Sequence, residues 1–167
     1  MNSNRIVLIS LFVVLIIYFY GCNEGLAPPE PNSKTSISGK ITYKGGIDNW
    51  PPVDSVYGIR VVAFKNYPPQ DIINEIISGN AYFTEESLAF YTDSSSFYIE
   101  INDPPVELQY IVVAWQYDSL ITSQKAAGVY TLTGDVNNPS KLNVQKGNAY
   151  KNIDINVDFK NLPPQPF

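Results

Sequence analysis

Apolar and polar residues alternate along several stretches of the chain, and turn-forming residues separate these stretches. The two clearest run over residues 37–43 and 153–160, where every second residue is apolar or glycine. Strict alternation of this kind indicates β-strands with one face in a core. Residues 111–115 are all apolar and predict a central strand that is buried on both faces. Residues 61–65 and 112–116 have similar sequences, and we expect them to form neighbouring core strands.

Further strands are predicted where β-branched and aromatic residues are concentrated between turn signals. These segments are residues 56–65, 97–101, 106–117, 129–133 and 141–144, with a weaker candidate at 88–91. Residues 71–78 break the β pattern, because isoleucines recur there at helical spacing between Asp71, a favoured N-cap residue, and Gly79. About seven strands within roughly 130 residues predict an all-β fold. We expect a single antiparallel β-sandwich over residues 35–161, with one short helix, and a Pro-rich tail at 162–167.

The N-terminal segment has a different character. One basic residue, Arg5, precedes an uncharged and mostly apolar run at 6–20, and Gly21-Cys22 follows. A transmembrane helix needs about 20 apolar residues, so this run fits the hydrophobic part of an export signal better than a membrane span. Residues 23–33 are rich in proline and poor in apolar side chains, as is typical of a tether. The alternatives are a membrane-anchoring helix, or an ordinary signal that a cysteine follows by chance.

The order of basic, apolar and small residues before a cysteine resembles the lipobox of bacterial lipoproteins. The position three before the cysteine is usually leucine in that family and is Phe19 here, whereas Gly21 fits the pattern. The resemblance implies cleavage after residue 21, attachment of diacylglycerol to Cys22, and a lipid-anchored location in the bacterial cell envelope, with the outer membrane favoured. The predicted organisation is then a signal peptide at 1–21, a lipidated cysteine and flexible tether at 22–34, and the sandwich domain.

Three features of the domain are shared with a known type of β-sandwich. They are the strand at 37–43, a Thr-Asp turn at 92–93 before the strand at 97–101, and a closing Ile-Asp-Ile-Asn-Val strand at 153–157. Together they resemble the carboxypeptidase-regulatory-like, or transthyretin-like, domains, although serine replaces the glycine that follows the Thr-Asp turn in that family. Such domains are typically non-catalytic structural or binding modules, so the resemblance implies that this chain is not an enzyme. A generic immunoglobulin-like sandwich is the alternative.

Composition narrows the possible chemistry. The formal net charge is −5 and the 11 Lys and Arg residues are scattered, so the clustered cations that nucleic-acid binding requires are missing. The chain has no His and one Cys, which excludes Ser-His-Asp triads, His-ligated zinc and an internal disulfide. Asp154, Asn156 and Asp158 match the start of a calcium loop, but the Gly and Glu that the loop needs at later positions are missing. We therefore expect no cofactor and no metal site.

Four aromatic residues beside prolines or in weakly patterned segments are the candidates for ligand contact: Trp50, Tyr67, Tyr82 and Phe83. Flat rings on loops can stack on sugar rings or anchor a protein partner, although they can equally cover the open ends of the core. The sequence thus predicts a membrane-anchored envelope lipoprotein that acts as a non-catalytic binding or structural accessory module. Its expected partners are membrane lipid and an envelope protein or glycan. The alternatives are a glycan-active hydrolase that uses carboxylates without His, and a carrier of a small apolar ligand.

Overall fold

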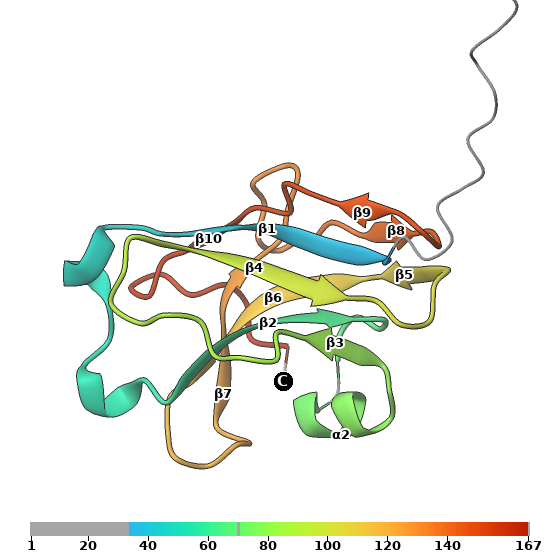
Figure 1. Cartoon of the computed structure of the whole chain (residues 1–167). Helices are drawn as coiled ribbons and strands as arrows, with labels where there is room; N and C mark the ends of the chain where they lie inside the picture. The colour runs from blue at the N-terminus through green and yellow to red at the C-terminus, as the bar shows by residue number, and fades with distance from the viewer. Residues whose placement is uncertain (1–33, 70, 167) are drawn as a thin grey trace, which may run out of the picture. The chain divides into compact units, whose positions relative to one another are not determined.

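The computed structural model describes residues 34–69 and 71–166, so the signal segment, Cys22 and most of the tether lie outside the described residues. The described residues form an all-β sandwich with one short α-helix, as the sequence predicts (Figure 1). The strands are β1 (Ser36–Tyr43), β2 (Gly58–Phe64), β3 (Ala81–Phe83), β4 (Ser94–Glu100), β5 (Val106–Leu108), β6 (Tyr110–Gln116), β7 (Gln124–Val129), β8 (Leu142–Val144), β9 (Ala149–Tyr150) and β10 (Ile155–Val157). The helices are η1 (Gly46–Asn49), η2 (Val53–Ser55) and α2 (Ile72–Ile77). Within these residues, every helix is too short or too polar to span a bilayer.

The first sheet has β1 at its centre, with β4 on one side and β9 and β10 on the other (Figure 1). β4 runs antiparallel to β1, whereas β9 and β10 run parallel to it. The sandwich is therefore mostly antiparallel, as predicted, except for these two pairs. Alternation over residues 153–160 identifies a strand and its buried face, but it carries no information about strand direction. No hairpin connects β10 to β1, so chain connectivity does not impose an antiparallel arrangement.

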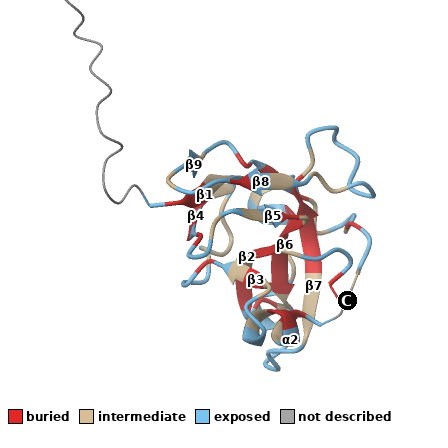
Figure 2. Cartoon of the chain, turned by 90° about the vertical axis from the view of Figure 1, so that its right-hand side faces the viewer, coloured by how far each residue is buried: buried red, intermediate tan, exposed pale blue. Residues whose placement is uncertain are grey.

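The second sheet has the strand order β3-β2-β6-β7, and all its pairs are antiparallel. Val61 of β2 lies opposite Val113 of β6, which confirms that the two similar segments are neighbours. β6 is buried on both faces, as predicted (Figure 2). Ile111, Val113 and Trp115 belong to the core between the sheets, and the intervening residues pack in a second cluster with Ile72 of α2.

α2 forms where the sequence predicts it. The Asp71 carboxylate accepts a hydrogen bond from the backbone N–H of Asn74 at 2.9 Å, which caps the first turn. Gly79 follows the helix in the left-handed conformation, with a φ of 71°. Ile72 and Ile76 pack in the apolar cluster on the outer side of the second sheet. The helix therefore covers part of a face that would otherwise expose valine and alanine side chains to water.

Several strand predictions need correction. Segment 106–117 contains two strands, because β5 pairs with β8 while β6 pairs with β2. The strand conformation is interrupted at Gln109 between them. Residues 88–91 form no strand, since this segment carries the chain from the second sheet to the first. The strand predicted at 129–133 corresponds to β7, which lies earlier in the chain. The prediction missed the start of β7 because its first two residues, Gln124 and Lys125, are polar. The described residues thus contain ten strands, where about seven were expected.

Two glycines allow unusually close approach of backbone segments. A Cβ atom on Gly128 of β7 would lie 2.6 Å from the carbonyl oxygen of Asn156 in β10. Since β7 and β10 are edge strands of different sheets, this contact closes the sandwich on their side. A Cβ atom on Gly39 of β1 would lie 2.5 Å from the carbonyl carbon of Ile153 and 2.9 Å from its nitrogen. Only glycine leaves room for the neighbouring backbone at both points.

Candidate functional site

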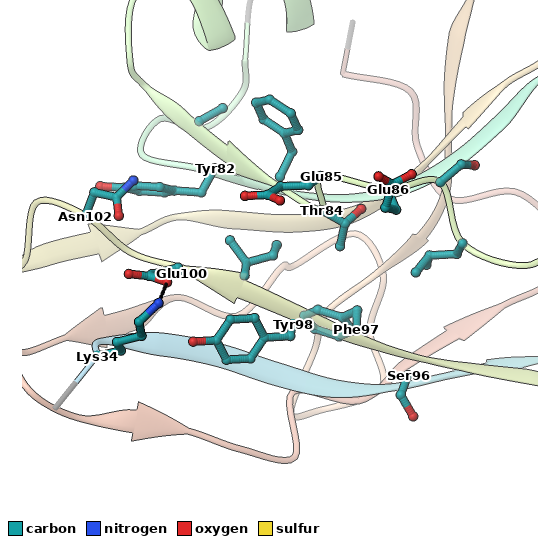
Figure 3. Close-up of a pocket in the computed structure, with 15 residues that line it drawn as sticks. Lys34, Tyr82, Thr84, Glu85, Glu86, Ser96, Phe97, Tyr98, Glu100 and Asn102 are labelled. Atoms are coloured by element: carbon teal, nitrogen blue, oxygen red, sulfur yellow. Dashed lines mark hydrogen bonds and ion pairs between the residues drawn. The ribbon is translucent and has the colours of Figure 1, made fainter.

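On the side opposite β7 and β10, the edge strands β3 and β4 belong to different sheets and border an open groove (Figure 3). The groove has a volume of about 840 Å³. Residues 81–88 form one wall and residues 96–100 of β4 form the other, with Lys34 and Asn102 completing the lining. Figure 3 shows Tyr82, Thr84 and Glu85 on one wall, across from Tyr98 and Glu100 on the other. The groove therefore runs along the edges of both sheets.

β4 presents an unpaired backbone edge to this groove. The N–H of Ile101, directly after β4, donates to the carbonyl oxygen of Thr35 at 2.9 Å, and the register of β4 with β1 continues from this pair. The odd-numbered residues of β4 therefore bond to β1. Because alternate strand residues direct their backbone groups to opposite sides, the N–H and C=O of Ser96, Tyr98 and Glu100 point away from β1. None of these groups has a hydrogen-bond partner among the described residues.

Hydrogen bonds to β2 hold the opposite wall in place. The N–H of Thr84 donates to the carbonyl oxygen of Val61 at 3.0 Å, and the Thr84 hydroxyl accepts from the N–H of Val61 at 3.3 Å. The Arg60 guanidinium donates to the carbonyl oxygen of Thr84 at 2.6 Å. Further along, the N–H of Leu88 donates to the carbonyl oxygen of Ile59 at 2.8 Å. These bonds fix the wall against the second sheet although only its first three residues form a strand.

The side chains that line the groove carry an excess of negative charge. Three carboxylates, those of Glu85, Glu86 and Glu100, face one amine, that of Lys34. The Lys34 amine pairs with Glu100 at 2.8 Å, and water reaches both side chains, which are 70% and 40% exposed. The ion pair leaves two carboxylates in the lining without a cationic partner in that lining. The groove therefore favours a positively charged ligand over a negatively charged one.

Apolar side chains form the floor and part of the rim. Phe97 and Ile99 are buried beneath the groove, and Leu88 is half-buried beside them. Two aromatic rings remain accessible at the rim: Phe83 is 39% exposed and Tyr98 is 53% exposed. A ligand in the groove would therefore meet an apolar floor, two rings and an acidic rim.

Tyr82 is held by charged neighbours. Its hydroxyl hydrogen-bonds to the Asp103 carboxylate, which also pairs with Lys65 at 2.7 Å. The hydrogen bonds from Lys65 and, secondly, from Tyr82 hold the pKa of Asp103 below its ordinary value. Burial and the bond to Asp103 raise the pKa of Tyr82. The phenol therefore stays protonated at neutral pH and serves as a hydrogen-bond donor that fixes the ring in the groove wall.

The edge of β7, on the other side of the sandwich, is covered. The Gln165 side chain of the C-terminal tail accepts a hydrogen bond from the N–H of Ala126 at 2.9 Å and donates one to its carbonyl oxygen at 3.0 Å. The side-chain amide thus takes the place of a peptide group in an adjacent strand. Exposed strand edges are ready templates for pairing with another chain, and proteins commonly block them. This chain blocks β7 at Ala126 and leaves the outer edge of β4 open.

No protein-family model, curated protein or solved structure matches this chain. The resemblances to bacterial lipoproteins and to transthyretin-like domains therefore stay predictions. The case for function depends on the geometry of the groove and on the N-terminal sequence.

The four candidate aromatic residues do not form a common surface, and Trp50 is not available to a ligand. Trp50 is only 8% exposed, and its indole N–H donates to the carbonyl oxygen of Thr92 at 3.0 Å. Its ring packs against those of Tyr43, Tyr91 and Phe159. Trp50 therefore covers the end of the core, which corrects its assignment as a possible contact residue. Its position beside prolines is compatible with either role, and the packing partners decide between them.

The other three candidates lie at two places. Tyr67 is 39% exposed, and its ring centroid lies 4.9 Å from that of Tyr110, outside the groove lining. Tyr82 and Phe83 both line the groove. The sequence did not single out Tyr98, which faces them from β4 (Figure 3). Its outward position in an alternating strand was readable, but no sequence signal marks that strand as an edge.

A second cavity, of about 420 Å³, lies between α2 and the second sheet. Its walls are mainly apolar and include Ile73, Ile76, Ile77, Phe83 and Ile121. Ile77 and Ile121 are largely exposed to water. This cavity has the chemistry of a site for a small apolar ligand.

The carboxylates of the suspected calcium segment are occupied by the protein itself. Asp154 accepts a hydrogen bond from the N–H of Lys40 at 2.8 Å. Asp158 pairs with Lys44 at 2.9 Å and accepts from the Asn49 amide at 3.2 Å. Across residues 34–69 and 71–166, no group of three or more His, Cys, Asp or Glu side chains is arranged to hold a metal ion.

Proposed function

We propose that this chain is a lipid-anchored envelope protein whose domain acts as a non-catalytic binding or structural accessory module, with the groove between β3 and β4 as its binding site. The observation that carries the proposal is the open backbone edge of β4, seven residues long, beside a groove of about 840 Å³. Proteins usually cover or interrupt such an edge, because it pairs readily with other chains. An edge that stays open beside a groove favours a role in holding a partner.

The lining of the groove supports binding over hydrolysis. Glycoside hydrolysis requires two carboxyl groups in different environments, one of them kept protonated in an apolar pocket. Glu85, Glu86 and Glu100 are all exposed, and Glu100 is paired with Lys34. Exposed carboxylates suit the recognition of a cationic partner better than proton transfer to a leaving group.

The N-terminal sequence supports the anchor. Cys22 is the only cysteine of the chain and directly follows the apolar run at 6–20 and Gly21. Residues 23–33 would then serve as a spacer between the membrane and the domain. Attachment of two or more acyl chains at Cys22 would hold the protein stably at the membrane, whereas one chain holds only marginally.

Replacing the cysteine tests the anchor. We expect the wild-type precursor, expressed in a bacterium supplied with labelled palmitate, to incorporate label and to sediment with membranes. Cys22→Ser should incorporate no label. A wild-type protein that stays unlabelled would show that the assignment of Cys22 is wrong, whatever the domain binds.

Photo-crosslinking tests the groove. A photoreactive amino acid is placed at Tyr98, on the groove, or at Leu132, which is 77% exposed and lies outside the groove lining. In the lipidated full chain in cells, we expect adducts from position 98 and none of the same mass from position 132. Identical adducts from both positions, or none from position 98, would overturn the groove as the binding site.

The apolar cavity under α2 supports a second candidate function, the transport or capture of a small apolar ligand. Its mainly apolar lining is the observation that favours it. A fluorescent fatty acid should then bind the protein, and Ile76→Lys should abolish the binding, because a charge would enter the cavity. Equal binding by the wild type and Ile76→Lys would eliminate this candidate.

A further inference from the structure

We propose that the groove binds an extended basic segment of a partner protein, which joins the first sheet as a new strand along the free edge of β4. The inference rests on the proposed function, because it names the ligand of the same site. Addition of a peptide strand to an open sheet edge is a general mode of recognition. In this mode main-chain hydrogen bonds supply affinity and the positions of alternate side chains supply specificity, and both are available in this groove.

The backbone of β4 offers an N–H and a C=O at each of Ser96, Tyr98 and Glu100. Native edges are usually protected by proline, lysine, a β-bulge or a covering segment. The β4 sequence Ser-Ser-Ser-Phe-Tyr-Ile-Glu contains neither proline nor lysine, and its pairing with β1 has no register shift. The β7 edge, by contrast, is covered by Gln165. β4 is longer than β3, the other strand that borders the groove, and unlike β7 it has no side chain bonded to its outer edge.

The side chains around the edge define the sequence that would fit. Successive residues of an added strand point to opposite faces of the sheet. One set would face the groove floor at Phe97, Ile99 and Leu88, where apolar residues fit. The other set would lie beside Tyr98 and Glu100 on the outer face. The excess of carboxylates in the lining makes Lys or Arg the complementary choice at these outer positions.

A second copy of this chain fits the edge less well than a basic peptide. Two β4 edges could satisfy each other's backbone groups, but pairing would bring two acidic linings together. The formal net charge of −5 for each chain adds to this repulsion. A basic segment satisfies the same backbone groups and relieves the repulsion among Glu85, Glu86 and Glu100.

The probe is a blocked peptide in which Val and Lys alternate four times, and its matched control has Glu in place of Lys. Binding is measured with the full-length lipidated protein in a non-ionic detergent, so that every variant carries the same micelle. Ser96→Pro removes an N–H that has no partner in the fold and places a ring in the groove, while Ser96→Ala keeps the N–H. Proline is tolerated on edge strands where the missing N–H faces solvent, so we expect both variants to fold.

We expect the Val-Lys peptide to bind at least about tenfold more tightly than the Val-Glu peptide, equivalent to about 1.4 kcal/mol. Ser96→Pro should weaken binding at least about tenfold, whereas Ser96→Ala should stay within about twofold of the wild type. Hydrogen exchange gives a second reading: the amides of Tyr98 and Glu100 should become protected by the peptide. The amides of Phe97 and Ile99, which already bond to β1, should change little.

A third reading needs no protein variant. A Val-Lys peptide that is N-methylated at alternate residues along one edge keeps its charge but loses the donors that β4 requires. Equal binding of this peptide and its parent, or equal binding by Ser96→Pro and the wild type, would overturn strand addition. Equal binding of the Val-Lys and Val-Glu peptides would overturn the basic ligand.

Crosslinking and peptide binding together distinguish failure of the strand-addition inference from failure of the proposed function. If crosslinks at position 98 persist while these peptides do not bind, the groove is a binding site for another kind of ligand and only the strand-addition inference fails. If crosslinks at position 98 and peptide binding are both absent, the proposed function fails as well. Crosslinks at position 98 to a second copy of this chain would overturn the basic peptide as the occupant.

Discussion

The close crossing of backbone at Gly39 leads to a prediction about stability. An alanine Cβ there would lie 2.5 Å from the carbonyl carbon of Ile153, and no side-chain rotation can relieve a contact with backbone. Overpacking of this kind costs about 1–3 kcal/mol, and we expect the upper part of that range because backbone has to move. Alanine offsets about 0.5–1 kcal/mol of this cost, since it loses less conformational freedom than glycine on folding. Gly39→Ala should therefore lower the free energy of unfolding by about 2 kcal/mol.

Gly58 in β2 provides the matched control. A Cβ atom there would lie 3.3 Å from Oε1 of Gln116, at the far end of a flexible side chain that can move aside. Gly58→Ala should therefore be neutral or should stabilise the domain by up to about 0.5 kcal/mol. The two variants make the same chemical change in strands of the two sheets. For a domain of this size, a difference of about 2 kcal/mol corresponds to about 7 °C in Tm.

Urea unfolding followed by tryptophan fluorescence measures both variants. Trp50 and Trp115 are buried, so their emission reports the opening of the core. If the slope of free energy against urea is unchanged, the shift in midpoint gives the difference in stability. A Gly39→Ala protein as stable as Gly58→Ala would refute the reasoning, because the segment around Ile153 could then move off β1 without cost.

Three further predictions concern the tail and the charged cluster at Tyr82. Gln165→Ala leaves the Ala126 backbone without its side-chain partners, so that amide should exchange hydrogen faster and stability should fall by about 1 kcal/mol; an unchanged exchange rate would contradict the covering role of the tail. The pKa of Asp103 is lowered by Lys65 and Tyr82, so its contribution to stability is present above its ordinary pKa of 3.8 and is lost as the pH falls through the folded value. Urea midpoints from about pH 5 to about pH 2 should therefore fall less steeply in Asp103→Asn than in the wild type. The pKa of Tyr82 is raised, so its contribution to stability is present below its ordinary pKa of 10.0 and is lost as the pH rises through the folded value. Ultraviolet titration of Tyr82→Phe should therefore lack one tyrosine that ionises late in the wild type.

The pattern of apolar and polar residues predicted those strands in which the burial of each face determines the residue types. Residues 36–43 alternate because β1 has one face in the core, and residues 111–115 are all apolar because β6 has a core on each side. The division of 106–117 into two strands was hidden, since both β5 and β6 are rich in apolar residues and only Gln109 separates them. Direction and order of strands depend on contacts between distant segments, and a period-two pattern contains no record of these contacts.

The candidate site could be predicted only in part, because it also depends on contacts between distant segments. Tyr82 and Phe83 were singled out by residue type, and they line the groove. The alternation over residues 97–101 puts Tyr98 and Glu100 on the outward face of their strand, but the open edge of β4 follows from its place at the end of the first sheet. The sequence around Trp50 does not distinguish a buried ring from an exposed one, because its burial depends on Phe159 from the far end of the chain.

The cover that Gln165 provides has a consequence for the size of any assembly this protein forms. With Ala126 of β7 bonded to Gln165, β4 of one copy cannot pair with that part of β7 in another copy. A chain that ends before Gln165 would have an open edge on each side of the sandwich, so β4 of one copy could pair with β7 of the next. Such head-to-tail contacts produce filaments when the rotation between copies does not close a ring. The side chain of one glutamine in the tail thus removes one of the two edges that this kind of propagating association needs.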